Sequence, residues 1–179
     1  MIAPNSRAAD ATDKRTYWQR FIEFIHPGPD SREELLVAFS DAEDNQVIGA
    51  ESRLMLEGVL RMADLTAGDV MVAAPRMDLI NLDAPLEVSL HQVIDTGHSR
   101  FPVYEGERDN LVGILLAKDL LKLQRAPSLN VRTLLRPPTF VPESKSLNDL
   151  LREFRNTRNH MALVVDEFGR IGGLITIED

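Results

Sequence analysis

Two seven-residue segments determine the fold that this sequence predicts. They are Gly113-Ile114-Leu115-Leu116-Ala117-Lys118-Asp119 and, sixty residues later, Gly173-Leu174-Ile175-Thr176-Ile177-Glu178-Asp179. Each begins with a glycine, continues through apolar residues typical of a strand, and reaches an aspartate where a helix is expected to start. Similarity at a fixed interval indicates that one structural unit occurs twice.

The residues around the first segment describe a complete unit. Short apolar runs predict strands, and apolar residues spaced i, i+4, i+7 and i+8 predict a helix. The expected elements are, in order, a strand at 79–82, a helix with Leu86, Leu90, Val93 and Ile94 on one face, a strand at 101–104, a polar turn at 105–110, a strand at 111–115 and a helix starting near Lys118 and Asp119.

The second copy repeats this order. Ser146 is expected to cap its first helix, with Asp149 three residues later. The elements are a strand at 140–141, a helix with Leu147, Leu150, Leu151 and Phe154 on one face, a strand at 161–165, a turn at 166–169, a strand at 172–175 and a helix start at Asp179. Gly113 then matches Gly173, and Asp119 matches Asp179.

Each copy is therefore a β-α-β-β-α unit, and the fold class is α+β. A three-stranded sheet of this size cannot bury both of its faces, so the two copies are expected to pack together around a pseudo-twofold axis. The expected domain boundaries are a flexible tail at 1–30, which includes an aromatic cluster, a helical lead-in at 31–65, a first repeat at 66–127 and a second repeat at 131–179. In the lead-in, helices are predicted after Asp30 or Ser31 and from about Ala50 to Met62.

Composition excludes several classes of protein. The chain of 179 residues is 44% hydrophobic and 27% charged, as in globular proteins, and it has no cysteine, which excludes disulfides, thiol nucleophiles and Cys-ligated zinc. We find no apolar run of about 18 residues and no signal-peptide pattern at the start, and therefore expect a cytoplasmic protein. A net charge of −8 makes nucleic acid an improbable partner.

The ordered set of segments resembles the CBS (cystathionine-beta-synthase-type) pair of the CorC/HlyC proteins, which are magnesium and cobalt efflux or hemolysin-like proteins related to the cyclin M transport mediators. The segments that carry the resemblance are Asp69 to Met71, His98 to Tyr104, Gly113 to Leu121, Val141 to Ser144, His160 to Gly169 and Gly173 to Asp179. One departure is Met71-Val72-Ala73-Ala74-Pro75-Arg76, which is one residue longer than the Met-x-Pro-Arg of the family. The chain also stops at Asp179, before the family's C-terminal transporter-associated domain, and we interpret it as truncated.

A candidate binding site lies where the second segment passes from strand to helix. There, the Thr176 hydroxyl and the first free N–H groups of a helix suit a phosphate, and Asp179, one turn later, can accept two ribose hydroxyls. The alternative is that Thr176 only caps the helix and Asp179 only complements its dipole. In the first repeat the position of Thr176 is occupied by Leu116, which has no hydroxyl, so we expect one competent site.

The resemblance extends this site and assigns its ligand. It implies that AMP, ADP or ATP binds between the repeats, with or without Mg²⁺, and that a segment of the first repeat faces the Thr-x-x-Asp segment of the second. In that segment Arg100 would neutralise phosphate, with Ser99 and the backbone of Phe101 and Pro102 shaping the wall. The full set of expected contacts is Val72, His98, Ser99, Arg100, Phe101, Pro102, Thr176 and Asp179.

The sequence contains no pattern that predicts catalysis or a resident metal. The four histidines lack partners at metal-binding spacing, and no nucleophile elbow or Gly-rich phosphate loop is present. We therefore expect a non-enzymatic regulatory module of a protein involved in magnesium and cobalt efflux, with a membrane ion transporter as a candidate partner, in the cytoplasm or peripheral to the inner membrane. The alternative is a ligand-free dimerisation scaffold. In either case Leu120, Leu121 and Leu123 predict a homodimer through helical faces.

Overall fold

The computed structural model describes residues 28–126 and 128–179. The expected tail, with its aromatic cluster, lies almost entirely outside this range. The chain divides into two compact units, Met1–Gly58 and Val59–Asp179. Each unit is described below by itself.

The first unit contains two helices that the sequence predicts. Helix α2 spans Arg32–Asp44 and helix α3 spans Ala50–Met62, so α3 continues into the start of the second unit. Ser31 caps α2, as one of the two expected caps, because its Oγ accepts a hydrogen bond from the backbone N–H of Glu34 at 3.1 Å. Arg53 of α3 forms ion pairs with Glu43 and Glu57.

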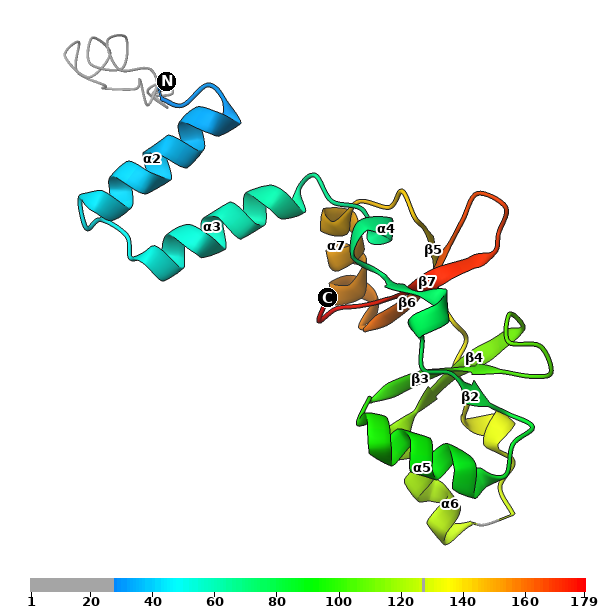
Figure 1. Ribbon diagram of the computed structural model, residues 1–179. Coiled ribbons are helices and arrows are strands. Elements are labelled where there is room, and N and C mark those ends of the chain that lie inside the picture. The colour runs from blue at the N-terminus through cyan, green and yellow to red at the C-terminus, as the bar shows by residue number, and fades with distance from the viewer. Residues whose placement is uncertain (1–27, 127) are drawn as a thin grey trace, which may run out of the picture. The chain divides into compact units, whose positions relative to one another are not determined.

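The second unit contains two small sheets (Figure 1). The first has the strand order β2-β3-β4 and the second has the order β1-β7-β6-β5. The strands are β1 (Val72–Ala73), β2 (Ile80–Asn81), β3 (Arg100–Tyr104), β4 (Leu111–Leu116), β5 (Phe140–Pro142), β6 (Met161–Val165) and β7 (Ile171–Thr176).

Helices complete the two repeats that the sequence predicts. In each repeat, a parallel strand pair is followed by an antiparallel hairpin: β2-β3-β4 in the first and β5-β6-β7 in the second. Ser146 caps the helix of the second repeat, as expected. The helical segments are α4 (Ala67–Val70), α5 (Leu86–Thr96), α6 (Leu121–Arg125) and α7 (Leu147–Thr157), with short 3-10 turns at Ala74–Arg76, Ala117–Leu120 and Val131–Leu134.

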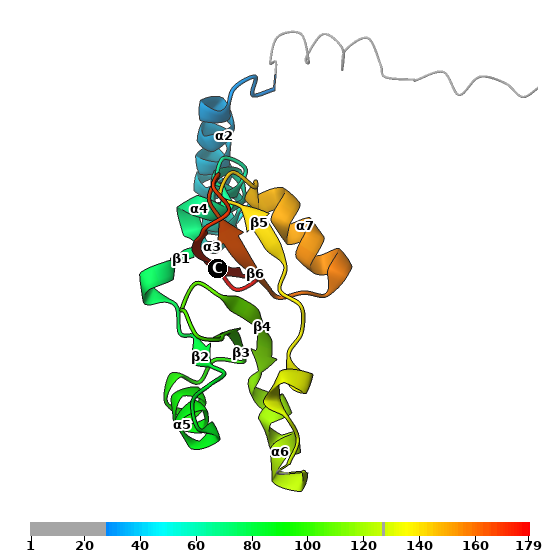
Figure 2. The same cartoon turned by 90° about the vertical axis from the view of Figure 1, so that its right-hand side faces the viewer.

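Each sheet pairs with a segment from the other repeat, and the sequence does not predict this exchange. Strand β1 belongs by sequence to the first repeat, yet Val72 pairs with Leu174 and Ala73 with Gly173 of β7 (Figure 2). In the opposite direction, Arg136 pairs with Ile114 of β4. In the 71–76 segment, β1 is followed by the 3-10 turn at Ala74–Arg76.

Two matched glycines make this exchange possible. A Cβ atom at Gly173 would lie 2.4 Å from the carbonyl oxygen of Val72, and one at Gly113 would lie 2.8 Å from Cβ of Leu135. Atoms cannot approach so closely, so only glycine leaves space for the crossing segment. The glycines with which the two sequence segments begin are therefore the places where the other repeat comes close: strand β1 at Gly173, and Leu135 with Arg136 at Gly113.

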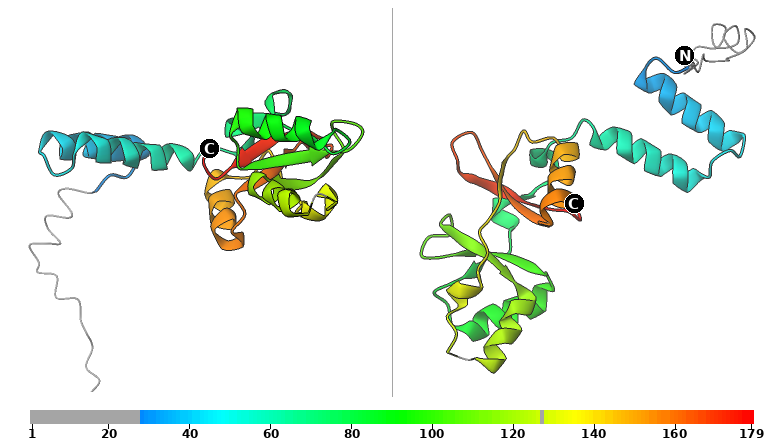
Figure 3. Two further views of the ribbon diagram at one scale, coloured as in Figure 1. Left: turned by 90° about the horizontal axis from the view of Figure 1, so that it is seen from below. Right: turned by 180° about the vertical axis from the view of Figure 1, so that it is seen from behind.

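Three apolar clusters hold the second unit together in layers. One lies between the sheets and includes Met77, Leu79, Leu163 and Leu174, and the sheets overlie one another when viewed from below (Figure 3). The outer face of the first sheet packs on α5 and α6, around Phe101 and Leu115. The outer face of the second sheet packs on α4 and α7, around Leu150, Phe154 and Val164.

Two expectations about apolar side chains need correction. Ile94 lies at the predicted apolar spacing of α5 but is 73% exposed, because the helix turns only Leu86, Leu90 and Val93 toward the sheet. Leu120 and Leu123 are 4% and 5% exposed and belong to the core of the first repeat, so they offer no surface to a second copy. Only Leu121 of that expected trio is exposed.

Candidate functional site

Four strand ends converge between the two repeats. Arg100, at the start of β3, pairs with Leu116 at the end of β4, and Met161, at the start of β6, pairs with Thr176 at the end of β7. Arg100, Leu116 and Met161 line one cavity of about 70 Å³. Thr176 lies on the strand next to Met161. Of the expected contacts, Arg100 lines this cavity, and Thr176 is the strand partner of the lining residue Met161.

Thr176 and Asp179 contact each other. The backbone N–H and the Oγ1 hydroxyl of Thr176 both donate to Oδ2 of Asp179, at 2.7 and 2.9 Å. Residues 177–178 form a turn and not a helix, so the expected helix start at Asp179 is not seen and the capping alternative stays open. Asp179 is exposed and Thr176 is half-buried. The two groups that a nucleotide would use are therefore accessible and held together.

The same pattern occurs a second time, at the N-terminus of α4. The backbone N–H and the Oγ1 of Thr66 both donate to Oδ2 of Asp69, each at 2.8 Å. The backbone hydrogen bond from Thr66, followed by the hydroxyl one, lowers the pKa of the Asp69 carboxyl. Thr66 lies outside the β-hairpins of the two repeats. A variant at Thr66 can therefore serve as a control for the same substitution at Thr176.

The expected contacts from the first repeat divide into accessible and buried groups. His98, Ser99 and Arg100 line a cavity of about 530 Å³ together with Leu116 and Lys118. His98 Nε2 lies 3.0 Å from an Asp78 carboxylate oxygen, and the His98 ring lies 5.8 Å from that of Phe101.

Of the remaining expected contacts, Phe101 and Pro102 are buried and Val72 is half-buried. Phe101 has an exposed fraction of 0%, Pro102 is also fully buried, and the Phe101 side chain packs in the core of the first repeat. These two residues can therefore face a ligand only through their backbone, as expected for the wall of the site. Val72 packs between the sheets, in register with Leu174 of β7. Whether these residues bind a ligand stays a prediction.

In the first repeat, the carboxylate at the position corresponding to Asp179 is held in ion pairs. Asp119 corresponds to Asp179, but it is only 6% exposed. Its carboxylate oxygens lie 2.9 Å from Nζ of Lys122 and 3.4 Å from Nη2 of Arg136. The hydrogen bond from Lys122 lowers the pKa of Asp119 most, the charges of Lys122 and Arg136 lower it further, and burial opposes them. This carboxylate is therefore not available to a ribose.

Replacing Asp119 by asparagine is expected to change the pH dependence of stability. Because the pKa of Asp119 is lower in the folded state, its contribution to stability is complete above the unfolded pKa of about 3.9 and is lost as the pH falls through the folded value. The Lys122 and Arg136 side chains are 60% and 56% exposed. Because solvent screens these ion pairs, Asp119→Asn should lower the free energy of unfolding at pH 7 by no more than about 1 kcal/mol. Urea melts of Asp119→Asn and wild type should differ at pH 7 and converge near pH 2. If the two proteins differed by the same free energy of unfolding at both pH values, the effect of the substitution would come from packing and not from charge.

Arg136 was missed by sequence reasoning. The repeat alignment that pairs Gly113 with Gly173 places Ile114 opposite Leu174, but only the strand pairing in the structure connects these positions to Arg136. The strand partners of these residues are Arg136 and Val72. Arg136 is therefore the counterpart of a residue that we had selected as a ligand contact.

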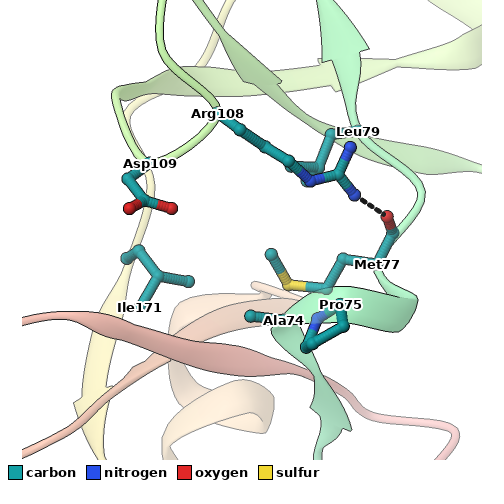
Figure 4. A pocket seen from close by; sticks show the side chains of 7 residues that line it. All are labelled: Ala74, Pro75, Met77, Leu79, Arg108, Asp109 and Ile171. Atoms are coloured by element: carbon teal, nitrogen blue, oxygen red, sulfur yellow. Dashed lines mark hydrogen bonds between the residues drawn. The ribbon is translucent and has the colours of Figure 1, made fainter.

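A separate cavity lies near the tip of the β3-β4 hairpin. It has a volume of about 230 Å³ and is lined by Ala74, Pro75, Met77, Leu79, Arg108, Asp109 and Ile171 (Figure 4). Nη2 of Arg108 donates to the carbonyl oxygen of Met77 at 2.8 Å, so this guanidinium ties the hairpin to the crossing segment. No expected contact residue lines this cavity.

The described residues contain neither a metal-ligand cluster nor a membrane-spanning helix. Within 28–126 and 128–179, no three His, Asp or Glu side chains gather as they would around a metal ion. Of the helices in this part of the chain, none is long and apolar enough to cross a membrane.

Family comparisons match both parts of the chain. The CBS domain matches residues 67–126 and again residues 131–179, which together are more than half of the sequence. The chain belongs to the CBS-domain family. Ahead of this CBS pair, the N-terminal region of NMB0537 matches residues 27–62.

Relatives of the CBS pair confirm the resemblance to CorC proteins. The magnesium and cobalt efflux protein CorC of Pasteurella multocida is 42% identical over 98% of this chain and 59% of its own length. A solved conserved domain of unknown function from Neisseria meningitidis is 45% identical, with a TM-score of 0.78, and the match covers 82% of this chain and 96% of that one. The chain spans about three fifths of the length of the curated CorC relatives.

A solved relative of this chain is in complex with ATP. It is the CBS domain of a bacterial CNNM/CorC family Mg²⁺ transporter in complex with ATP. It is 36% identical to this chain, with a TM-score of 0.65, and the match covers 72% of this chain and 92% of that one. The likeness therefore extends over most of the second unit.

Proposed function

We propose that this CBS pair is a regulatory module that binds an adenine nucleotide between its two repeats. The observation that carries the proposal is the convergence of strand ends that brings Arg100 near the strand bearing Thr176, with Asp179 exposed beside it. The ATP complex of the CNNM/CorC relative supports the choice of ligand class.

Each side chain has a role suited to its chemistry. The Thr176 hydroxyl would donate to a phosphate oxygen or accept from a ribose hydroxyl, and the Asp179 carboxylate would accept from ribose. Arg100 would neutralise phosphate, because guanidinium groups pair well with phosphate oxygens. AMP, ADP and ATP, with or without Mg²⁺, share these features. The site holds and senses a ligand, and no residue in it is placed to break a bond.

The proposal for the whole protein is a role in magnesium and cobalt ion homeostasis. Regulation requires that the nucleotide bind more tightly to one of two states of the module, because equal affinity for both would shift nothing. A membrane ion transporter is the proposed responder, with the module in the cytoplasm or peripheral to the inner membrane. The CorC relatives support this context.

A second candidate function is a ligand-free homodimeric scaffold. The exposed apolar side chains of α5 and α6 favour it: Val88, Ile94 and Leu121 are 54%, 73% and 62% exposed. Burying such side chains would stabilise a dimer by about 1.5 kcal/mol or more for each one. A dimer and a nucleotide site are compatible, so dimer formation alone does not decide between the two functions.

A thermal-shift panel tests the proposed function. AMP, ADP and ATP, each with and without Mg²⁺, are added to the chain, with S-adenosylmethionine as a non-phosphorylated comparison. A ligand at 100 times its Kd should add about 2.7 kcal/mol of stability. We expect a shift with at least one nucleotide. Unchanged melting with every nucleotide, together with a dimeric mass by light scattering, would favour the scaffold.

A further inference from the structure

The helical lead-in has no buried core among the described residues. No residue of α2 or α3 is buried, and three consecutive apolar residues of α3, Leu54, Met55 and Leu56, are 55%, 60% and 39% exposed. Consecutive residues point to different sides of a helix, and a helix that is apolar on several sides is normally covered by other parts of its protein. Within the described part of the chain, these side chains have no such cover.

A matching apolar segment lies earlier in the same unit. The unit comprises Met1–Gly58, and residues 14–25 of its sequence contain six aromatic or aliphatic residues. Four of them recur at the spacing i, i+3, i+4 and i+7, which is that of one face of a helix. These four are Trp18, Phe21, Ile22 and Ile25. Gln19 and Glu23 fall on the opposite side of the same helical pattern, so the segment is amphipathic.

Chain connectivity and charge both favour α2 as the neighbour of this segment. Only residues 26–31 separate the segment from α2, and they include the helix-breaking run Pro27-Gly28-Pro29. Connections of about two to eight residues join helices that pack side by side in antiparallel directions. Residues 14–25 contain three basic side chains and one acidic side chain, whereas α2 contains one basic and five acidic side chains. Opposite net charges attract the segment to α2.

We infer that residues 14–25 pack as a helix on α2 and α3, with Trp18 and Phe21 covering the exposed apolar side chains around Met55. The occupant of this surface is thus a segment of the same chain. The short connection at 26–31 keeps the effective concentration of the segment at about millimolar, so docking does not need a high intrinsic affinity. The segment, α2 and α3 all precede the CBS match, which starts at residue 67, and the inference is independent of the proposed nucleotide site.

Fluorescence of Trp18 tests this docking directly, because Trp18 is the only tryptophan of the chain. In the full chain, its emission should be blue-shifted and its quenching by acrylamide several-fold slower than for a free tryptophan derivative. Both properties should be independent of protein concentration, as expected for a contact within one chain. Emission and quenching equal to those of the free derivative would overturn the inference and leave residues 1–30 as the flexible tail that the sequence predicts.

Met55→Asp should increase the undocked fraction about 10-fold or more, because it removes a large apolar contact and adds a charge to the surface. Met55 is exposed, so this substitution removes no buried side chain from α2 and α3 themselves. Ile94→Asp is the matched control. It makes the same change in charge at a side chain of α5 that is 73% exposed, and Trp18 should keep its wild-type emission. An equal red shift in both variants, or none in Met55→Asp, would contradict the inference.

Hydrogen exchange gives a second measurement that does not depend on tryptophan. Phe21→Asp should speed amide exchange in residues 32–58 about 10-fold or more, and Gln19→Asp, which adds the same charge to the polar side, should leave it unchanged. Equal exchange in both variants and wild type would overturn the docking. A blue shift of Trp18 that appears only at high protein concentration would assign the surface to a second copy. One that appears only with vesicles of phosphatidylglycerol and phosphatidylcholine would assign the segment to a lipid surface, and either result would replace the inference.

Discussion

Thr176→Val is expected to weaken nucleotide binding about 5-fold to 150-fold. Valine keeps the β-branched shape of threonine and removes the hydroxyl, so a phosphate or ribose oxygen bonded to it loses its partner. An unpaired polar group in a binding site costs about 1 to 3 kcal/mol, and 1.4 kcal/mol corresponds to a factor of ten. Calorimetric titration with AMP and ATP gives the affinity, and a urea melt of the same protein gives the stability.

Thr66→Val is the matched control, because Thr66 makes the same two hydrogen bonds to Asp69 that Thr176 makes to Asp179. Both variants lose a hydroxyl that donates to an aspartate three residues later, so each should lower the free energy of unfolding by about 1 kcal/mol. Only Thr176→Val should change the affinity for nucleotide. If the two variants have the same stability loss and both bind nucleotide like wild type, Thr176 is a cap and not a ligand contact.

Gly173→Ala is expected to destabilise the CBS pair by about 3 kcal/mol. The new methyl group would lie 2.4 Å from the carbonyl oxygen and 3.1 Å from the carbonyl carbon of Val72. Backbone atoms cannot rotate away from it, so β1 must separate from β7 or the sheet must distort, and overpacking of this kind costs about 1 to 3 kcal/mol. Urea denaturation monitored by circular dichroism measures the loss.

Gly172→Ala, one residue earlier in the same strand, is the control. Its methyl group would lie 2.7 Å from a carboxylate oxygen of Glu143, which is the end of a flexible and exposed side chain that can move. We expect a change of less than about 0.5 kcal/mol. If both alanine variants have equal stability, the close approach of β1 does not constrain position 173, and the strand exchange is less tight than the structure shows.

The order of elements could be predicted from the sequence because it depends on local patterns. The apolar spacing after Leu86, the caps at Ser31 and Ser146, and the two glycine-led segments each depend on residues within one turn or one strand. The expected helix at 50–62 is α3, with the same ends. The pairing of the two repeats also followed from the sequence, since a three-stranded sheet cannot bury both of its faces.

The tertiary structure alone decided how the strands cross and what surrounds each site. No local pattern shows that Val72 pairs with Leu174 or that Arg136 reaches Asp119, because these partners are far apart in the chain. Burial likewise depends on the whole packed core: Leu120 and Leu123 are covered, while Ile94 at an apolar helical spacing remains exposed. Part of the candidate site could be predicted from the sequence, and part of it depends on the tertiary structure. Thr176 and Asp179 are recognisable as neighbours in sequence, whereas Arg100 and Leu116 of the first repeat meet Met161 of the second only because the two repeats fold against each other.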